Sequence, residues 1–136
     1  MPLLFQPKAQ SVIMCDFGGF LVPEMIKVRP VVVISKHKHN KKLVTVIPLS
    51  TTKPTTMYGY HHELILNPLP DKPKVQCWAK CDMIYTVSLA RLDRYKTVQK
   101  QYVVPELSDA DFAAIQNCVA FALNLRHNSN VPARGL

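Results

Sequence analysis

An arginine at the start of one apolar run and two hydroxyl residues at the end of the next could together bind an anion. Arg29 precedes the sequence PVVVIS, and Ser50 and Thr51 follow the sequence LVTVIPL. If the two runs pair as a hairpin, the start of the first strand lies beside the end of the second, so Arg29 and Ser50 would face one ligand. A guanidinium fork with a neutral hydroxyl donor suits a phosphate group. The alternative is a surface arginine beside an ordinary Ser/Thr turn, and the local pattern leaves both open.

A second polar pair, Lys80 and Asp82, flanks a cysteine in another strand-like stretch. Alternation along a strand places both side chains on the same side. The pair is either an ion pair of small energetic weight or a carboxylate whose pKa is tuned by nearby cations. Spacing alone does not decide between these readings.

Histidines offer either metal ligands or proton-transfer groups. His37 and His39 lie in the basic sequence KHKHNKK, and His61 is followed directly by His62. No carboxylate or cysteine stands at a recognised metal spacing, and the lysines around His37 oppose a cation, so we expect no metal and no cofactor. His61 or His62 could transfer a proton near neutral pH, and half-exposed strand histidines are the alternative.

Composition favours a single domain with an anionic partner. The chain has 136 residues, and its 17 Lys and Arg exceed its 9 Asp and Glu, for a net charge of +8. Such a balance points to nucleic acid, with a basic surface kept for solubility as the alternative. The chain has no signal-peptide pattern at its start and no run long enough to span a membrane, so we expect a cytoplasmic protein. The cysteines form no C-x-x-C pair and are expected to be free thiols.

Short β-rich runs must position these side chains. Turn residues separate five strand-like stretches: Ser11–Phe17, Arg29–Ser35, Leu43–Ser50, His61–Leu66 and Val75–Val87. The last is expected to bend near Asp82. The apolar period then changes, and Ser108 can cap a helix over about 109–125, with Asp111 near its positive end. The pattern predicts a mainly β protein with a C-terminal helix (α+β), built as a small twisted β-barrel or half-open sheet. Residues 126–136 lack a core pattern and are expected to be flexible.

In this order, the pieces resemble the PemK/MazF family, the toxins of bacterial type II toxin–antitoxin modules. The stretch RPVVV carries most of the resemblance, and VTVIPLSTT, WAKCDMIYTVSLARL and the C-terminal helix follow it in the family's order. The resemblance covers about residues 10–125. It implies one domain over 1–136, folded as an SH3-like β-barrel with a helix.

The resemblance also implies a function. Members of this family are metal-independent, sequence-specific endoribonucleases of single-stranded RNA, such as mRNA, and usually form homodimers. A cognate antitoxin neutralises them and binds DNA with them. The family's arginine falls on Arg29, its hydroxyl residue on Ser50, and its Arg-x-Asp pattern on Lys80 and Asp82. The chain departs from the family's usual pattern at Gln10–Ser11, at Lys80 and at Met83–Tyr85.

A mechanism that fits these residues uses the substrate's own 2′-hydroxyl as the nucleophile on the adjacent phosphate. We expect Arg29 to neutralise the phosphorane, Ser50 to orient it and Asp82 to act as the base or as an orienting group. His61 and His62 are the first residues to test as the acid. The residues expected to contact RNA are Lys27, Thr51, Lys80, Tyr85, His61 and His62.

Tyr85 and Trp78 could stack on an unpaired base, with packing as the alternative for Trp78. The competing function is a weak or inactive SH3-like module that binds nucleic acid or protein without chemistry. A toxin homologue with another target, such as a topoisomerase, is a further alternative.

Overall fold

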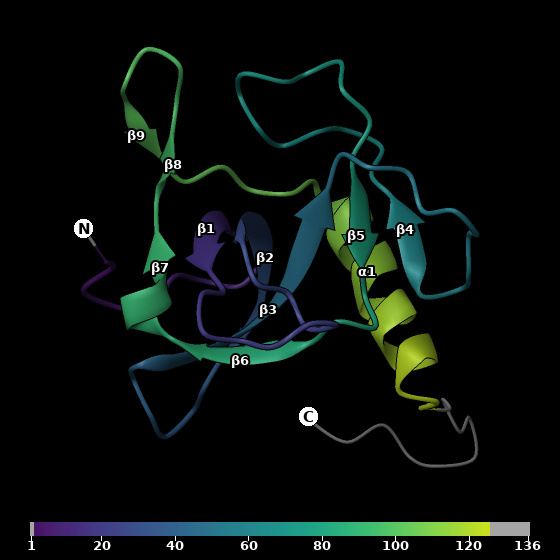
Figure 1. Ribbon diagram of the computed structural model, residues 1–136, viewed down its shortest axis with the longest axis horizontal. Coiled ribbons are helices and arrows are strands. Elements are labelled where there is room, and N and C mark those ends of the chain that lie inside the picture. The colour runs from purple at the N-terminus through teal and green to yellow at the C-terminus, as the bar shows by residue number, and fades with distance from the viewer. Residues whose placement is uncertain (1, 126–136) are drawn as a thin grey trace.

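Antiparallel strands form a curved sheet, and one helix packs against it (Figure 1). The computed structural model describes residues 2–125. The elements are β1 (Val12–Asp16), β2 (Val28–Lys36), β3 (Leu43–Ser50), β4 (His61–Glu63), β5 (Trp78–Lys80), β6 (Tyr85–Ser88), a 3-10 turn (Leu89–Arg91), β7 (Leu92–Asp93), β8 (Tyr95–Lys96), β9 (Tyr102–Val103) and α1 (Asp109–Ala122). The mainly β fold with a C-terminal helix is therefore confirmed. The strand expected over Leu43–Ser50 has those bounds, and the tail at 126–136 lies outside the described residues.

The strands follow one another across the sheet in the order β4, β5, β3, β2, β1, β7, and β6 also pairs with β3. Two strands, β5 and β6, pair with the same edge of β3. Its first half pairs with β6, from Leu43 opposite Ser88, and its last two residues pair with β5. The expected bend near Asp82 is the turn that connects these two partners.

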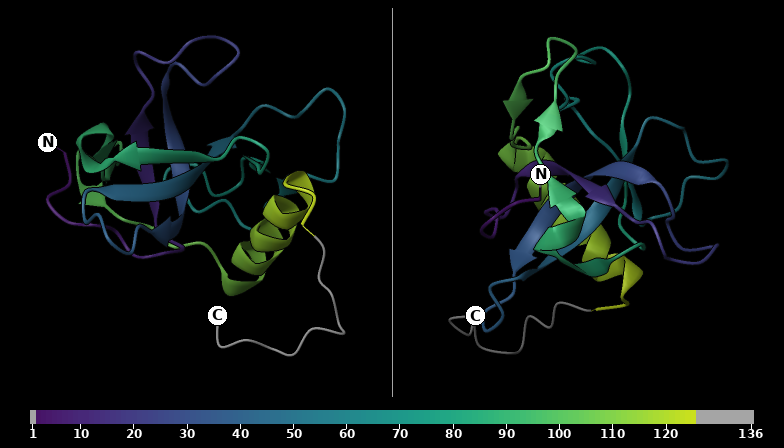
Figure 2. Two further views of the ribbon diagram at one scale, coloured as in Figure 1. Left: turned by 90° about the horizontal axis from the view of Figure 1, so that it is seen from below. Right: turned by 60° about the vertical axis from the view of Figure 1, so that its left-hand side comes forward.

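Of the two expected forms, a small twisted β-barrel or a half-open sheet, the structure has the open sheet. No pairing among residues 2–125 joins β4 to β7 at the two ends of the strand order. Both end strands are very short, with three residues in β4 and two in β7, so each offers few backbone groups to a further partner. At the β4 end, α1 packs against the sheet instead of another strand (Figure 2).

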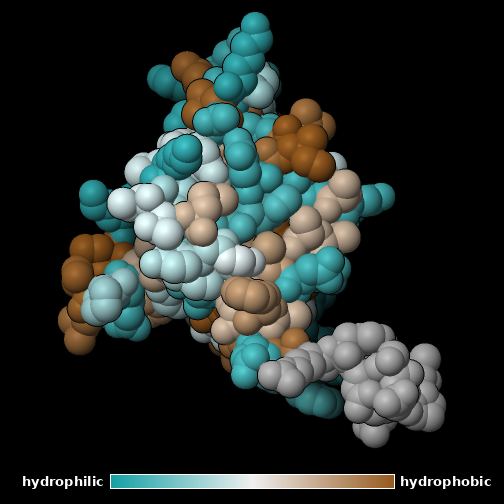
Figure 3. Space-filling view, turned by 90° about the vertical axis from the view of Figure 1, so that its right-hand side faces the viewer, coloured by the Kyte–Doolittle hydropathy of each residue, from teal (hydrophilic) through white to brown (hydrophobic). Residues whose placement is uncertain are grey.

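Both faces of the central strands are buried, because successive residues of a strand point to opposite faces. Val32 packs in a cluster beneath α1 that includes Ile115, whereas Val31 and Val33 pack in a second cluster around Phe17. This explains why β2 reads as a continuous apolar run. On the side that carries α1 and β4, the exposed hydrophobic side chains form separate groups between hydrophilic ones (Figure 3).

Helix α1 is held to the sheet by a buried carboxylate. The hydroxyl of Ser108 accepts the N–H of Asp111 at 3.2 Å, which is the predicted helix cap. The carboxylate of Asp111 is fully buried. It accepts hydrogen bonds from the N–H groups of Ile65 (2.9 Å) and Leu66 (3.3 Å), and from the hydroxyl of Ser108 (3.2 Å). His62 Nε2 lies 2.9 Å from the same carboxylate.

The same bonds explain why β4 is shorter than expected. The sequence predicts a strand over His61–Leu66, but the strand ends at Glu63. Ile65 and Leu66 donate their N–H groups to Asp111 and so leave the ladder. No helix within the described part of the chain is long and apolar enough to cross a membrane.

Candidate functional site

The hairpin of β2 and β3 brings Arg29 and Ser50 together. Val31 pairs with Pro48 and Val32 with Ile47, and the same register continued by two residues places Arg29 opposite Ser50. Both residues line a pocket of about 120 Å³, together with Thr51. We call it the arginine pocket, and its polar lining residues are Arg29, Ser50, Thr51, Lys72 and Tyr95.

The arginine pocket is equipped for an anion. The Nε atom of Arg29 is buried and has no hydrogen-bond partner in the described structure. Arg29 also forms no ion pair with any residue between 2 and 125. A buried guanidinium nitrogen without an acceptor costs free energy, and an anion in the pocket would supply that acceptor.

Two further groups strengthen this preference. The hydroxyl oxygen of Ser50 accepts the N–H of Thr52 at 3.1 Å, which leaves its own proton free to donate. Lys72 adds a second positive charge, and no carboxylate lines the pocket. Lys72 lies in a loop whose position is fixed by Asp71. The Asp71 carboxylate accepts hydrogen bonds from the hydroxyl of Tyr95 (3.1 Å) and the N–H of Val98 (2.9 Å).

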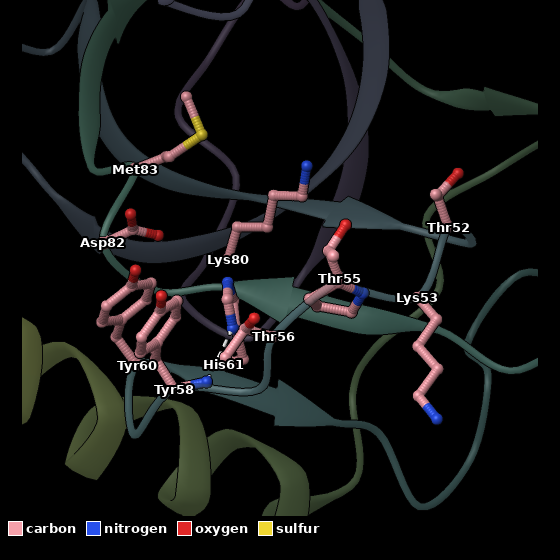
Figure 4. Close-up of a pocket in the computed structure, with 11 residues that line it drawn as sticks. Thr52, Lys53, Thr55, Thr56, Tyr58, Tyr60, His61, Lys80, Asp82 and Met83 are labelled. Carbon is pink, nitrogen blue, oxygen red and sulfur yellow. Dashed lines mark hydrogen bonds between the residues drawn. The ribbon is translucent and has the colours of Figure 1, made fainter.

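A larger pocket of about 480 Å³ contains the other predicted pair. Its lining residues include Lys80, Asp82 and His61 (Figure 4). We call it the tyrosine pocket, after Tyr58 and Tyr60 in its wall. Lys80 and Asp82 form no ion pair in the described structure. Figure 4 shows the Lys80 amine pointing away from the Asp82 carboxylate, which lies beside Tyr60.

Aromatic rings form one side of the tyrosine pocket. The ring of Tyr58 stacks on Tyr60 with centroids 5.3 Å apart and 16° between the planes. The ring of His61 meets Tyr60 edge-on at 4.6 Å. The N–H of Tyr58 donates to His61 Nδ1 at 3.1 Å, so a neutral His61 carries its proton on Nε2. Desolvation, followed by the charge of Asp82 and the nearby Tyr58, raises the pKa of Tyr60.

The predicted site residues lie on neighbouring strands, and the arginine pocket is also lined by Leu49 and Leu69 from the cluster beneath α1. Ser50 pairs with Trp78, and Lys80 pairs with His61. Residues directly opposite each other in a ladder share a face, so Arg29, Ser50, Lys80 and His61 all belong to the face turned away from α1. Two strand spacings of about 4.8 Å and an offset of two residues along the strands separate the backbones of Arg29 on β2 and Lys80 on β5 by roughly 12 Å. Thr51 lines one pocket and Thr52 the other.

Four other predicted residues line neither pocket. His62 points to the opposite face, against Asp111. Tyr85 lies among aromatic rings, 4.9 Å from that of Phe17, and its hydroxyl accepts the N–H of Met25 at 2.9 Å. Lys27 is exposed in the β1–β2 loop, and Trp78 is only 3% exposed, which leaves it no open surface for stacking.

Some site residues were missed from the sequence. Lys72 lies in the proline-rich sequence NPLPDKPK, where no local pattern indicates its destination. Tyr58 and Tyr60 stand in the sequence YGYHH, and two aromatic residues around a glycine beside a predicted strand could have drawn attention. His37 forms a turn, because its Nδ1 accepts the N–H groups of His39 and Asn40. Among residues 2–125, no three His, Cys, Asp or Glu side chains gather in a way that could hold a metal ion.

Comparisons with known proteins show which family and which relative this chain is similar to. Residues 8–123 match the family described as the PemK-like, MazF-like toxin of type II toxin–antitoxin systems. The chain is 32% identical over 145 residues to the uncharacterized protein YifN of Escherichia coli (strain K12), covering 91% of this chain and 96% of that protein.

Solved structures of low sequence identity share the fold. One is MazF (crystal form I) from Deinococcus radiodurans, with a TM-score of 0.65, 16% identity, and coverage of 88% of this chain and 97% of that one. Another is an endoribonuclease in complex with its cognate antitoxin from mycobacterial species, with a TM-score of 0.62, 21% identity, and coverage of 90% and 100%. Because the family match spans nearly the whole described chain, and a relative of almost equal length supports it, this protein belongs to the PemK/MazF-like family of type II toxins.

Proposed function

We propose that this protein is an endoribonuclease toxin that cleaves single-stranded RNA, with the cleaved phosphate in the arginine pocket. One observation carries the proposal. Arg29 presents a buried, unpartnered Nε in a pocket that also holds the Ser50 hydroxyl and the Lys72 amine, but no carboxylate. A phosphodiester would satisfy these donors and balance their charge. Family membership and the endoribonucleases among its structural neighbours support the reaction class.

The reaction begins with attack of the ribose 2′-hydroxyl on the adjacent phosphorus. The bond to the 5′-oxygen breaks, which leaves a 2′,3′-cyclic phosphate on one product and a 5′-hydroxyl on the other. The guanidinium of Arg29 offsets the extra negative charge of the phosphorane, and the Ser50 O–H donates to a non-bridging oxygen. Because an arginine stays protonated at any working pH, its role is electrostatic. This route needs no metal ion.

Residues of the tyrosine pocket carry out the proton transfers. Asp82 is the base that takes the 2′-hydroxyl proton, or the group that orients that hydroxyl. His61 is the acid that protonates the leaving oxygen through Nε2. This step requires the imidazolium form, in which Nδ1 is also protonated and no longer accepts the Tyr58 N–H. His62 is left out of this role, because Asp111 holds it on the other face. The RNA lies across Thr51 and Lys80 with Lys27 at the rim, and its affinity falls with salt.

We also propose the partners that the family implies. A cognate antitoxin neutralises the nuclease, and the toxin acts as a homodimer in the cytoplasm. The structural neighbours support the first point, because they include MazE–MazF from Deinococcus radiodurans and an endoribonuclease with its cognate antitoxin.

Cleavage of a long unstructured RNA in EDTA tests the proposal. We expect the wild type to cleave, Arg29→Ala to lose roughly 100-fold or more in rate, and Ser50→Ala to lose about 10-fold. Arg94→Ala also removes one positive charge but lies outside both pockets, so it should cleave at the wild-type rate. Wild type that cuts no RNA of varied sequence would overturn the reaction, and full activity of Arg29→Ala would overturn the assigned site. Loss of wild-type cleavage in EDTA that Mg²⁺ restores would overturn the metal-free route.

One observation favours a second function, a module that binds RNA without cutting it. Asp82 lies in a different pocket from Arg29, so the proposed base and the phosphate site are not yet joined in the free protein. The same assay separates the two functions. RNA bound with an Arg29-dependent affinity, without any product, would favour the module.

A further inference from the structure

We propose that the tyrosine pocket binds one unpaired nucleobase, stacked against Tyr58, and sets a base preference beside the cleaved phosphate. The proposal rests on the proposed function, because the base belongs to the RNA whose phosphate occupies the arginine pocket. It replaces Trp78 and Tyr85 as the expected stacking residues.

The size and lining of the pocket suit a base. At about 480 Å³ it has four times the volume of the arginine pocket, whose 120 Å³ suits a phosphate. Figure 4 shows the stacked tyrosines on one side and the hydroxyls of Thr52 and Thr55 on the other. A flat ring on the aromatic side would therefore turn its polar edge toward hydroxyls that both donate and accept.

Tyr58 offers an aromatic surface that the other candidates lack. The residue Tyr58 is 53% exposed, whereas Trp78 is 3% exposed and Tyr85 packs on Phe17 and Phe20. Stacking tolerates every base, since each has a π-face, and the polar wall of the pocket then discriminates among them.

The platform is already fixed in the free protein. Tyr58 stacks on Tyr60, and its N–H is bonded to His61. Gly59 lies between the two tyrosines, directly against the ring of Phe121 from α1, where an added Cβ would stand 2.6 Å from a ring carbon. A ring held in place before binding loses little conformational entropy when a base stacks on it.

The two pockets are lined by consecutive residues, which suits neighbouring parts of one RNA strand. Thr51 and Thr52 are consecutive residues that line the arginine pocket and the tyrosine pocket respectively. A phosphate beside Arg29 and a base beside Tyr58 would therefore lie on either side of this short segment. Lys53 and Lys80 in the second pocket supply charge for the backbone of the same nucleotide.

Binding to 2′-O-methyl RNA oligonucleotides tests this inference, because the methyl group blocks the attacking hydroxyl. Each oligonucleotide carries a single abasic nucleotide, moved one position at a time, and binding is followed by fluorescence anisotropy. With wild type, we expect roughly 10- to 100-fold weaker binding when the abasic nucleotide occupies one particular position. Tyr58→Ala should show the same loss on intact RNA, and no further loss when that position is abasic.

Matched variants separate stacking from damage to the fold. Tyr58→Phe keeps the ring and should bind within about two-fold of wild type, whereas Tyr58→Leu should resemble Tyr58→Ala. Tyr102 is an exposed tyrosine on β9 that lines neither pocket, and Tyr102→Ala should leave the abasic profile unchanged. Circular dichroism confirms that each variant is folded, and Tyr58→Phe supplies the readout if the shorter side chains do not fold.

The outcomes distinguish this inference from the proposed function. Wild-type affinity of both Tyr58→Ala and Tyr58→Leu for intact RNA would overturn the base site, even if Arg29→Ala abolishes cleavage. Losses from Tyr58→Ala and from the abasic nucleotide that add at every position would also overturn it, as would a tenfold loss in folded Tyr58→Phe. If wild type neither binds nor cleaves any RNA, the proposed function itself fails, and this inference fails with it.

Discussion

Replacing Asp111 with alanine should destabilise the protein strongly, because it removes the buried carboxylate that holds α1 to the sheet. The carboxylate is fully buried and serves four groups: the N–H groups of Ile65 and Leu66, the Ser108 hydroxyl and the His62 ring. A buried donor left without an acceptor costs about 1–3 kcal/mol. Ile65 and Leu66 are exposed residues whose backbone can turn toward water, so the four costs do not simply add. We expect a loss of about 3–5 kcal/mol, similar to breaking a buried ion pair.

Urea denaturation followed by circular dichroism measures this loss. Small domains unfold with slopes of about 1–3 kcal/mol per M of urea, so the midpoint should fall by about 2 M. Asp111→Asn keeps one oxygen acceptor but loses the charge, and should cost about 2 kcal/mol. Asp109→Asn is the matched control, because Asp109 lies in the same helical turn but is exposed, and it should cost less than about 1 kcal/mol.

The pH dependence gives an independent check on the same carboxylate. Burial alone would raise the pKa of Asp111, but the hydrogen bonds it accepts, first the one from Ile65, lower it below the ordinary value of 3.8. A lowered folded-state pKa adds stability that is fully present above the unfolded-state pKa and is lost as the pH falls through the folded-state pKa. The stability gap between wild type and Asp111→Asn should therefore be largest near neutral pH and shrink below about pH 4. A gap that is constant with pH, or an Asp111→Ala cost below about 1 kcal/mol, would refute the reasoning.

Two further predictions concern the arginine pocket and the thiols. Lys72→Ala should weaken binding of 2′-O-methyl RNA and lower the slope of log affinity against log salt by about 1. Lys74 lies outside both pockets, so Lys74→Ala should change this slope less. Equal slopes for the two variants would contradict a role for Lys72 in the arginine pocket. A thiol reagent at pH 8 should modify half-buried Cys118 first, because burial raises the pKa of Cys15 to about 12 and that of Cys77 to about 11. Mass spectrometry follows the order of modification, and rapid labelling of Cys15 in the folded protein would contradict this prediction.

The sequence predicts the central strands and the helix well, because their signals are local. Long apolar runs and a serine cap act through near neighbours, and β3 and the start of α1 match the expected bounds. Strands β7 to β9 have two residues each, too few to show alternation. The early end of β4 depends on Asp111, more than 40 residues away, which no local pattern could indicate.

In the candidate site, too, the sequence predicts only the residues whose positions follow from local signals. Arg29 and Ser50 could be paired from the sequence because a hairpin fixes which ends of two strands meet. Lys72 could not, because it reaches their pocket from a proline-rich loop that is fixed by contacts with β8 and the following turn. Adjacent histidines carry the same local signal, and only the position of α1 determines that His61 faces the pocket and His62 the helix.

Because β5 and β6 pair with different parts of β3, the turn between them is not part of either pairing. Asp82 and Met83 line the tyrosine pocket from the turn between β5 and β6, where neither residue belongs to a ladder. This turn can therefore change its length or side chains while both strands keep their register on β3. A lineage could therefore alter what the tyrosine pocket accepts by varying Met83, while Asp82 and the strand pairings on β3 are kept.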